Sequence, residues 1–361
     1  MTPTRLRMWP PLPPGVWLRR PTRAAFPLEA PGSLLLRKAR QALYFGIQGL
    51  GLRAGDEILL PAYHHGSEVE ALLRAGLSIR FYDVDARMAP DPEQLEALID
   101  GSTRALHLTH FLGRPQDAPA WREWCDDRAL LLIEDAAQAW LGTIDGRPVG
   151  SWGDISIFCL YKTLGVPDGG VLAPCPPESA PTGRTPHGVR LLLRRHLAWA
   201  LNRLPHGAPW GRAPYDPDDY DPAGDFDLGD PSTPVSRATK LVLERALRGD
   251  VAERRRTNHR YLLGALESLV PEGLRELLPG ASPFVFPIAS AAKAAMLDHL
   301  HVAGIDCLNL WTVPHPSLRE ADFPIATRFR RTLVGLPVHQ DLKRRDLDRI
   351  VAEVNRARNG V

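Results

Sequence analysis

The sequence predicts an α/β protein with a mainly parallel sheet and a smaller α/β unit near its C-terminus. Three observations support this prediction. Short apolar runs alternate with helix-length segments, the runs are continuously apolar as in a sheet covered on both faces, and 361 residues suffice for two domains. Strand-like runs lie at residues 57–63, 78–84, 104–111, 129–136 and 155–161, and helix-length segments lie at 67–76, 91–99 and 118–127.

The segment before these runs has two parts. Residues 1–30 are proline-rich, which predicts an irregular N-terminal arm. Residues 33–52 have helical spacing of apolar side chains and end in glycines, so we expect one helix there. The "GLGLRAG" stretch at 49–55 follows a helix and has one residue too many for a dinucleotide-binding fingerprint, so it is read as a helix stop and a turn.

Residues 175–235 break the alternating pattern. Residues 188–204 predict one basic amphipathic helix, and the acidic stretch 214–234 predicts a loop. The basic helix could contact a membrane or an anionic lipid-linked substrate, but packing on the large domain with a solvated arginine face is favoured, so membrane contact is not expected. We therefore predict an arm (1–30), a large domain (31–235, with an irregular insertion at 175–235) and a small domain (236–361).

The small domain shows its own alternation of helices and strands. One long helix is expected from residue 236 to 269, followed by a strand at 284–290 and a helix at 292–304. The stretch 333–357 predicts a last strand and helix.

Composition excludes several classes of function. A net charge of +2 gives no reason to expect nucleic-acid binding. The four cysteines form no C-x-x-C pair, which favours reduced thiols and a cytoplasmic location. His107 and His110 fall on opposite faces of a strand, so no metal site is expected. No run reaches the roughly 18 apolar residues of a membrane span, and "PPLPPGV" stands where a signal peptide would have its apolar region.

Three polar residues follow the carboxyl ends of strands, where α/β sheets bind ligands. They are Asp135, Gln138 and Lys162, and the chain contains only five lysines. Pyridoxal 5'-phosphate (PLP) chemistry needs such a set, because an amine forms a Schiff base with the cofactor and a carboxylate keeps the pyridine nitrogen protonated. Each residue also has a simpler interpretation: Lys162 as a lysine at a strand end whose charge reaches water, Asp135 as a helix N-cap, and Gln138 as a solvated helix residue.

The segment "IEDAAQAWLGTIDGRPVGSWGDISIFCLYKTLGVPDGG" resembles the core of the DegT/DnrJ/EryC1/StrS family, the PLP-dependent sugar aminotransferases of fold type I. The likeness extends over roughly residues 36–355. It implies that Asp135 binds the pyridine nitrogen, that Gln138 contacts the ring hydroxyl and that Lys162 forms the Schiff base, with Gly169 and Gly170 at the family's distance. It also places His65 where an aromatic ring stacks on the cofactor; a structural histidine at a turn is the alternative.

The sequence departs from the family pattern at the phosphate-binding positions. Lys38, Ala39 and Arg40 stand where the family has Ser or Gly-Thr, and Cys159 replaces a serine. We therefore expect Ala39, Arg40 and Cys159 to line the phosphate end of the cofactor site. The family's Asn-Tyr-Arg stretch, which enters the neighbouring subunit's site, is not visible before Ser236.

The resemblance implies an aminotransferase that moves an amino group from an amino acid, expected to be glutamate, to a keto-sugar nucleotide or similar ketone. It also implies a homodimer with a shared active site. His110, Trp311 and His315 are candidate substrate contacts, with core packing as the alternative for Trp311. Two other functions stay open: a PLP enzyme with a non-sugar substrate or a dehydratase-like outcome, and a cofactor-less binding protein on the same fold.

Overall fold

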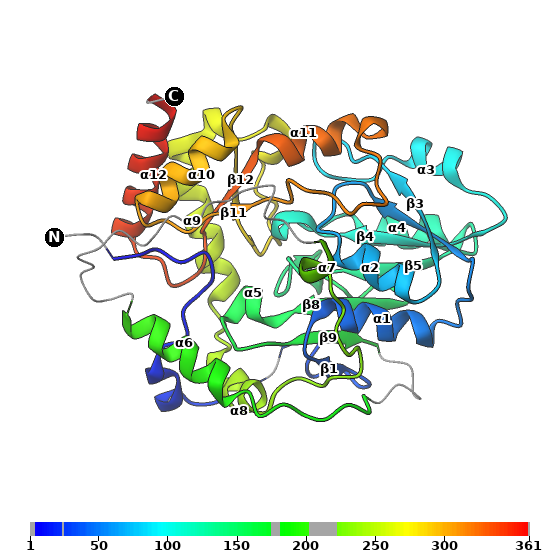
Figure 1. Ribbon diagram of the computed structural model, residues 1–361, viewed down its shortest axis with the longest axis horizontal. Helices are drawn as coiled ribbons and strands as arrows, with labels where there is room; N and C mark the ends of the chain where they lie inside the picture. Colours follow the sequence, from blue (N-terminus) through cyan, green and yellow to red (C-terminus); the bar gives the residue numbers. More distant parts are fainter. Residues whose placement is uncertain (1–3, 24, 175–180, 202–221, 360–361) are drawn as a thin grey trace.

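The computed structural model describes residues 4–23, 25–174, 181–201 and 222–359. Its largest sheet has seven strands in the order β1-β9-β8-β5-β4-β2-β3 (Figure 1). These strands are β1 (Leu34–Leu36), β2 (Glu57–Pro61), β3 (Ser78–Tyr82), β4 (Thr103–Thr109), β5 (Leu131–Asp135), β8 (Ile155–Cys159) and β9 (Gly170–Ala173). Five neighbouring strands of this sheet are parallel: β8, β5, β4, β2 and β3. Strand β9 runs antiparallel to both β8 and β1. The predicted mainly parallel sheet is confirmed.

Helices cover both faces of this sheet, as the continuous apolar runs predicted. They are α1 (Ala39–Gly49), α2 (Ser67–Arg74), α3 (Pro92–Leu98), α4 (Ala118–Asp126) and the short α5 (Leu160–Leu164). Successive residues of a strand point to opposite faces. Ile58 accordingly clusters with Leu43 of α1, whereas Leu59 clusters with Trp121 of α4 on the other face.

The expected helix over residues 33–52 is wrong at its beginning. Leu34, Leu35 and Leu36 form the edge strand β1, which pairs with β9, and α1 begins only at Ala39. Strand pairing with a distant segment overrides the local helical spacing, because an unpaired edge would leave backbone groups of β9 without partners. The turn predicted at 49–55 is confirmed, since α1 ends at Gly49 and Gly51 has a positive φ of 72°.

The C-terminal part contains a second sheet of three antiparallel strands in the order β10-β12-β11. The strands are β10 (Phe286–Ala289), β11 (Leu308–Asn309) and β12 (Leu333–Leu336), and the helices are α8 (Arg237–Ala246), α9 (Val251–Leu266), α10 (Lys293–Val302), α11 (Pro324–Thr332) and α12 (Arg344–Asn359). The single helix expected over 236–269 is two helices, α8 and α9, separated by Leu247–Asp250. The division into domains stays a prediction; α8 shares a hydrophobic cluster with the large sheet, which favours a boundary between α8 and α9.

The remaining elements are short, apart from the 13-residue helix α6. They are η1 (Pro14–Leu18), η2 (Phe111–Gly113), β6 (Thr143–Ile144), β7 (Arg147–Pro148), α6 (Val189–Leu201), α7 (Pro222–Asp225), η4 (Glu267–Leu269), η5 (Glu272–Leu274) and η6 (Glu320–Asp322). The arm lies against the C-terminal part, where Leu6 bridges to Ile305 and Arg5 pairs with Asp306 at 2.5 Å. Part of the acidic stretch predicted as a loop, residues 214–221, lies outside the described residues.

Helix α6 exposes Arg190 and Arg194, as expected of a solvated arginine face, but it exposes apolar side chains as well. None of its residues is fully buried. Val189, Leu193 and Leu197 are exposed by 54%, 60% and 58%, next to Arg190 and Arg194. No helix in the described part of the chain combines the length and the apolarity needed to cross a bilayer.

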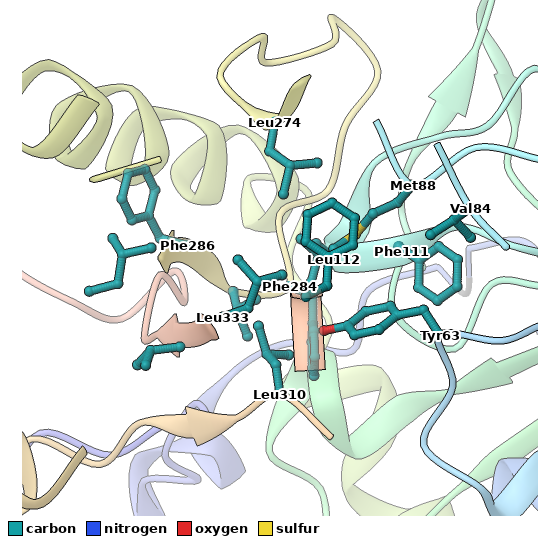
Figure 2. Packing of buried hydrophobic residues seen from close by; sticks show 14 of the residues in the cluster. Tyr63, Val84, Met88, Phe111, Leu112, Leu274, Phe284, Phe286, Leu310 and Leu333 are labelled. Atoms are coloured by element: carbon teal, nitrogen blue, oxygen red, sulfur yellow. The ribbon is translucent and has the colours of Figure 1, made fainter. Parts of the chain in front are cut away.

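One hydrophobic cluster joins the two sheets. Figure 2 shows Tyr63 and Phe111, which come from the large sheet's strand ends, packed with Phe284, Leu310 and Leu333 from the C-terminal part. The rings of Tyr63 and Phe111 lie 5.6 Å apart at their centroids. The junction between the two parts is therefore filled with apolar side chains, and it supports the pocket described next.

Candidate active site

A pocket opens beyond the carboxyl ends of β5 and β8, where the parallel sheet meets the C-terminal part. Its empty space is about 870 Å³ including the part open to solvent. The lining residues are Trp9, Lys38, Ala39, Arg40, Leu43, His65, Ser67, Glu68, Asp135, Ala137, Gln138, Ile157, Cys159, Tyr161, Lys162, Phe284, Leu308 and Trp311. The predicted residues Ala39, Arg40, His65, Asp135, Gln138, Cys159, Lys162 and Trp311 are all among them.

Lys162 lies in α5, the single short helix that follows β8. Its Nζ lies 5.3 Å from the centroid of the Phe284 ring, and within the described residues no hydrogen bond or ion pair of Nζ is recorded. The backbone is held more firmly, because Arg255 donates from Nη2 to the carbonyls of Lys162 (3.2 Å) and Thr163 (3.0 Å). The amine is therefore free to react while the backbone that carries it is fixed.

Asp135 ends β5 with a carboxylate that is only partly satisfied. One oxygen, Oδ1, accepts from the backbone N–H of Ala137 at 2.9 Å. The other, Oδ2, lies 3.9 Å from Nε2 of His107, a buried ring nitrogen that has no hydrogen-bond partner. Burial raises the pKa of Asp135, with His107 and Lys162 acting in the opposite direction. A buried carboxylate that lacks a strong cationic partner suits a charged N–H donor such as a pyridinium.

Gln138 and His65 approach the pocket from other walls. Gln138 accepts from the backbone N–H of Leu112 at 2.9 Å through Oε1, which fixes its side chain and leaves the amide N–H₂ as its donor. His65 lies edge-on to Trp311, with ring centroids 6.4 Å apart, and its buried Nδ1 has no partner. Burial lowers the pKa of His65 to about 4, so the ring is neutral near pH 7. A neutral ring can stack on a cationic cofactor without charge repulsion.

The start of α1 forms the cationic end of the pocket. Gly170 allows this close approach, because a Cβ there would lie 2.3–2.5 Å from backbone atoms of Lys38 and Ala39. Burial and the neighbouring Arg40 lower the pKa of Lys38. Arg40 donates from Nη1 to the carbonyls of Asp225 (2.8 Å) and Asp227 (3.0 Å). A helix start with two cations suits a phosphate.

Cys159 lies on the same pocket wall at the end of β8. The side chain is buried, and burial raises the pKa of its thiol. The thiol is therefore neutral, and it can offer a phosphate only a weak donor.

Of the three candidate substrate contacts, Trp311 lines the pocket, and His110 and His315 do not. His110 is fully buried away from it: Nε2 lies 2.9 Å from Glu134 and Nδ1 accepts from the Gln116 N–H at 2.9 Å. Both ring nitrogens of His110 are engaged in holding neighbouring loops, so the expectation that it faces the substrate is corrected.

His315 stands behind the lining instead of in it. Its ring packs on Phe226 at 5.3 Å, and Nε2 lies 3.7 Å from a Glu70 oxygen. Phe226 in turn meets the ring of His65 at 5.8 Å. His315 therefore reaches the site indirectly, through Phe226 and through its electrostatic interaction with Glu68.

Sequence reasoning missed several residues of the site: Trp9, Lys38 as a lining cation, Glu68, Tyr161, Arg255 and Phe284. Trp9 comes from an arm without periodic pattern, so no local signal could place it. Arg255 lies in the middle of the "RRR" run, and it differs from its two neighbours in being buried, with 1% of its surface exposed. Within the described residues, no group of three histidine, cysteine or acidic side chains could hold a metal ion.

Comparison with known proteins agrees with this geometry. Residues 33–185 match the model of the DegT/DnrJ/EryC1/StrS aminotransferase family. The chain is 29% identical over 134 residues to GDP-perosamine synthase of Vibrio cholerae, and it spans 36% of that protein. It is 27% identical over 327 residues to dTDP-3-amino-3,4,6-trideoxy-alpha-D-glucose transaminase of Streptomyces venezuelae. This aligned region covers 87% of this chain and 79% of the relative.

The fold also matches solved structures. The aminotransferase PseC of Helicobacter pylori superimposes with a TM-score of 0.67 at 16% identity, over 99% of this chain and 100% of that one. A likeness at this identity establishes the fold only.

Proposed function

We propose, from the premise that the chain belongs to the DegT/DnrJ/EryC1/StrS aminotransferase family, that it is a PLP-dependent aminotransferase acting on a keto-sugar nucleotide or similar ketone. One observation carries the proposal. Lys162 and Asp135 face one pocket from the ends of adjacent strands, and the Asp135 carboxylate lacks a strong cationic partner.

The residues present fit this cofactor. Asp135 would bind the pyridine nitrogen, Gln138 would donate to the ring hydroxyl, and the neutral His65 ring would cover one face. The start of α1, with Lys38, Ala39 and Arg40, would take the phosphate, beside Cys159. When bound, PLP supplies a carbonyl carbon for an amine and a ring that accepts electrons from the substrate.

Lys162 would act twice in the reaction. Its amine would hold the cofactor covalently as a Schiff base. Once an amino donor, expected to be glutamate, has freed it, the amine would take up the proton of the donor Cα and return it within the pocket. Arg255 would fix the lysine backbone while the amine moves that proton. The reverse sequence would pass the amino group to the ketone.

We further propose a homodimer with a shared site and a cytoplasmic location. The pocket is not fully enclosed, so a second copy of the chain could approach it and contribute residues that lie far from the pocket in this subunit. Relatives of this chain are named as transferases of amino groups to dTDP- and UDP-linked sugars, which supports a nucleotide-linked acceptor.

PLP titration of the protein, followed by absorbance, tests the proposal. We expect an absorption band typical of a lysine–PLP Schiff base that is absent in Lys162→Ala. Two lysines serve as controls: Lys240→Ala on the exposed face of α8 should retain the band, and Lys38→Ala should retain it while binding PLP more weakly. A protein that stays colourless with excess PLP would be the cofactor-less alternative.

Glutamate separates the remaining alternative. Addition of glutamate to the PLP-loaded enzyme without acceptor should convert the cofactor to its amine form and release one equivalent of keto acid. The presence of Lys162 argues against a dehydratase, because that branch of the family has histidine there. Release of ammonia in place of an amine-form cofactor would favour the non-aminotransferase alternative.

A further inference from the structure

A second pocket lies next to the active site, between the N-terminal arm and α6. Its empty space is about 980 Å³, again including the part open to solvent. The lining residues are Arg7, Met8, Trp9, Pro10, Pro11, Leu12, Pro167, Leu191, Arg194, Arg195, Ala198, Trp199 and Asp306. No residue of this second pocket except Trp9 takes part in the chemistry proposed above.

Three arginines line this pocket, and they differ in whether a described carboxylate pairs with them. Arg7 pairs with Asp306 at 3.3 Å. Among the described residues no carboxylate forms an ion pair with Arg194 or Arg195. Arg195 is turned toward the body of the protein, and burial lowers its pKa, with the Tyr161 hydroxyl acting in the opposite direction. A half-buried guanidinium that no described carboxylate neutralises favours an anion, and a phosphate fits its planar donor fork well.

The other walls suit a flat apolar group. Trp9 and Trp199 contribute indole rings, and Met8, Leu12, Leu191 and Ala198 contribute apolar surface. Indole faces stack on nucleobases with little dependence on the base, and each stacked base contributes roughly 1–3 kcal/mol in proteins that bind nucleotides this way. Arginines beside indoles therefore match a phosphate joined to a base.

Two contacts connect this pocket to the active site. Trp9 lines both pockets and packs on Phe284 with ring centroids 5.4 Å apart, and Phe284 also lies 5.3 Å from Nζ of Lys162. Tyr161 lines the active site and interacts electrostatically with Arg195. The two pockets therefore share the Trp9 wall, and a ligand that rounds this indole would occupy both.

We propose that the pocket between the arm and α6 binds the nucleoside diphosphate part of the acceptor, with Arg194 and Arg195 on the phosphates and an indole of Trp9 or Trp199 against the base. This inference rests on the proposed function, because it assigns a position to the nucleotide of the expected substrate. It makes Arg195 a specificity-determining residue for nucleotide-linked acceptors.

The experiment uses the PLP-loaded full-length protein and three probes: dTDP, UDP and GDP. Calorimetric titration should detect binding of at least one of them. Loss of a charge-assisted phosphate contact in Arg195→Gln should weaken that binding about ten- to a hundredfold. Arg190→Gln is the matched control, because it makes the same change on the exposed face of the same helix and does not line the pocket. Its affinity should equal that of the unaltered protein.

Two measurements keep the interpretation unambiguous. Arg195→Lys should bind with intermediate affinity, because it retains the charge but loses the fork of donors. Equal unfolding midpoints for the arginine variants would exclude a general loss of structure as the cause. The inference is overturned if none of the three nucleotides binds, or if Arg195→Gln and Arg190→Gln bind the nucleotide equally well.

The glutamate half-reaction separates this inference from the proposed function. It needs no acceptor, so Arg195→Gln should perform it at the rate of the unaltered enzyme. An intact half-reaction with unchanged nucleotide affinity would refute only the subsite. Failure of the half-reaction in every form, together with arginine-dependent nucleotide binding, would refute only the aminotransferase.

Discussion

Replacement of Arg255 by leucine tests how the fold holds the reactive lysine. The Arg255 guanidinium is 1% exposed and donates to four acceptors. These are Oε1 of Gln340 and the carbonyls of Pro283, Lys162 and Thr163. Among the described residues, a second donor is found for the Thr163 carbonyl alone, from Gln340 at 3.0 Å.

The magnitude follows from the acceptors that lose their donor. Each buried acceptor left without a donor costs about 1–3 kcal/mol. In Arg255→Leu, three buried acceptors lose their donor. The variant also no longer buries a charge, which is unfavourable in the folded protein, since burial lowers the pKa of Arg255 to about 10. We therefore expect Arg255→Leu to lower the free energy of unfolding by about 3 kcal/mol. The Lys162 backbone should also move, and PLP should bind more weakly.

Urea denaturation at pH 7 and PLP titration measure the two effects. Arg260→Leu is the control, because Arg260 is exposed on the same helix and, within the described residues, its ion pair is with the exposed Glu253. It should change stability by less than about 0.5 kcal/mol. An Arg255→Leu protein as stable as this control, with unchanged PLP affinity, would refute the assigned role of Arg255 in holding Lys162.

Three further predictions concern other parts of the molecule. Asp135→Asn should stabilise the cofactor-free protein at neutral pH, because burial raises the pKa of Asp135 and makes its charged carboxylate unfavourable in the folded state. The higher urea midpoint of the variant should vanish in acid, where Asp135 of the unaltered protein is protonated as well. Turnover with PLP should fall by on the order of a hundredfold or more. Gly170→Ala should weaken PLP binding, measured by titration, since its Cβ would displace the backbone of Lys38 and Ala39; unchanged affinity would show that the start of α1 tolerates the shift. Buried neutral histidines should make the protein acid-labile, because below pH 6.5 these histidines are protonated in the unfolded chain but not in the folded chain. The free energy of unfolding should therefore fall by up to about 5 kcal/mol per pH unit between pH 6 and 4. A flat pH profile in this range would contradict the prediction. The histidines concerned have pKa values lowered by burial to about 3 or 4: His64, His65, His259 and His339.

The parts of the fold that could be predicted from sequence are those that local pattern determines. The five central strands and α2, α3 and α4 follow from apolar runs and from Asp91 and Asp117, which cap α3 and α4. The strand β1 could not be predicted, because its three leucines continue a helical pattern and only pairing with β9 makes them a strand. The break between α8 and α9 involves Gly249, a weak signal inside a strong helical pattern.

The site divides in the same way. Asp135, Gln138 and Lys162 follow strand ends, so sequence order places them at one edge of the sheet. Trp9 reaches the pocket from a segment without secondary structure, and Phe284 reaches it through a loop. His110 also follows a strand end, but its ring turns toward Glu134, and no pattern in the sequence distinguishes that orientation.

The apolar cluster shown in Figure 2 limits how a substrate can enter. Tyr63, Phe111 and Phe284 interlock across the junction of the two sheets, and packed side chains do not slide past one another without losing contacts. The halves therefore cannot swing apart about a hinge at low cost. Entry falls to the rim, where Trp9 of the arm lines the pocket and Phe226 packs on the ring of His65. The rate of substrate uptake should then depend on the release of these two rings and not on the movement of a domain.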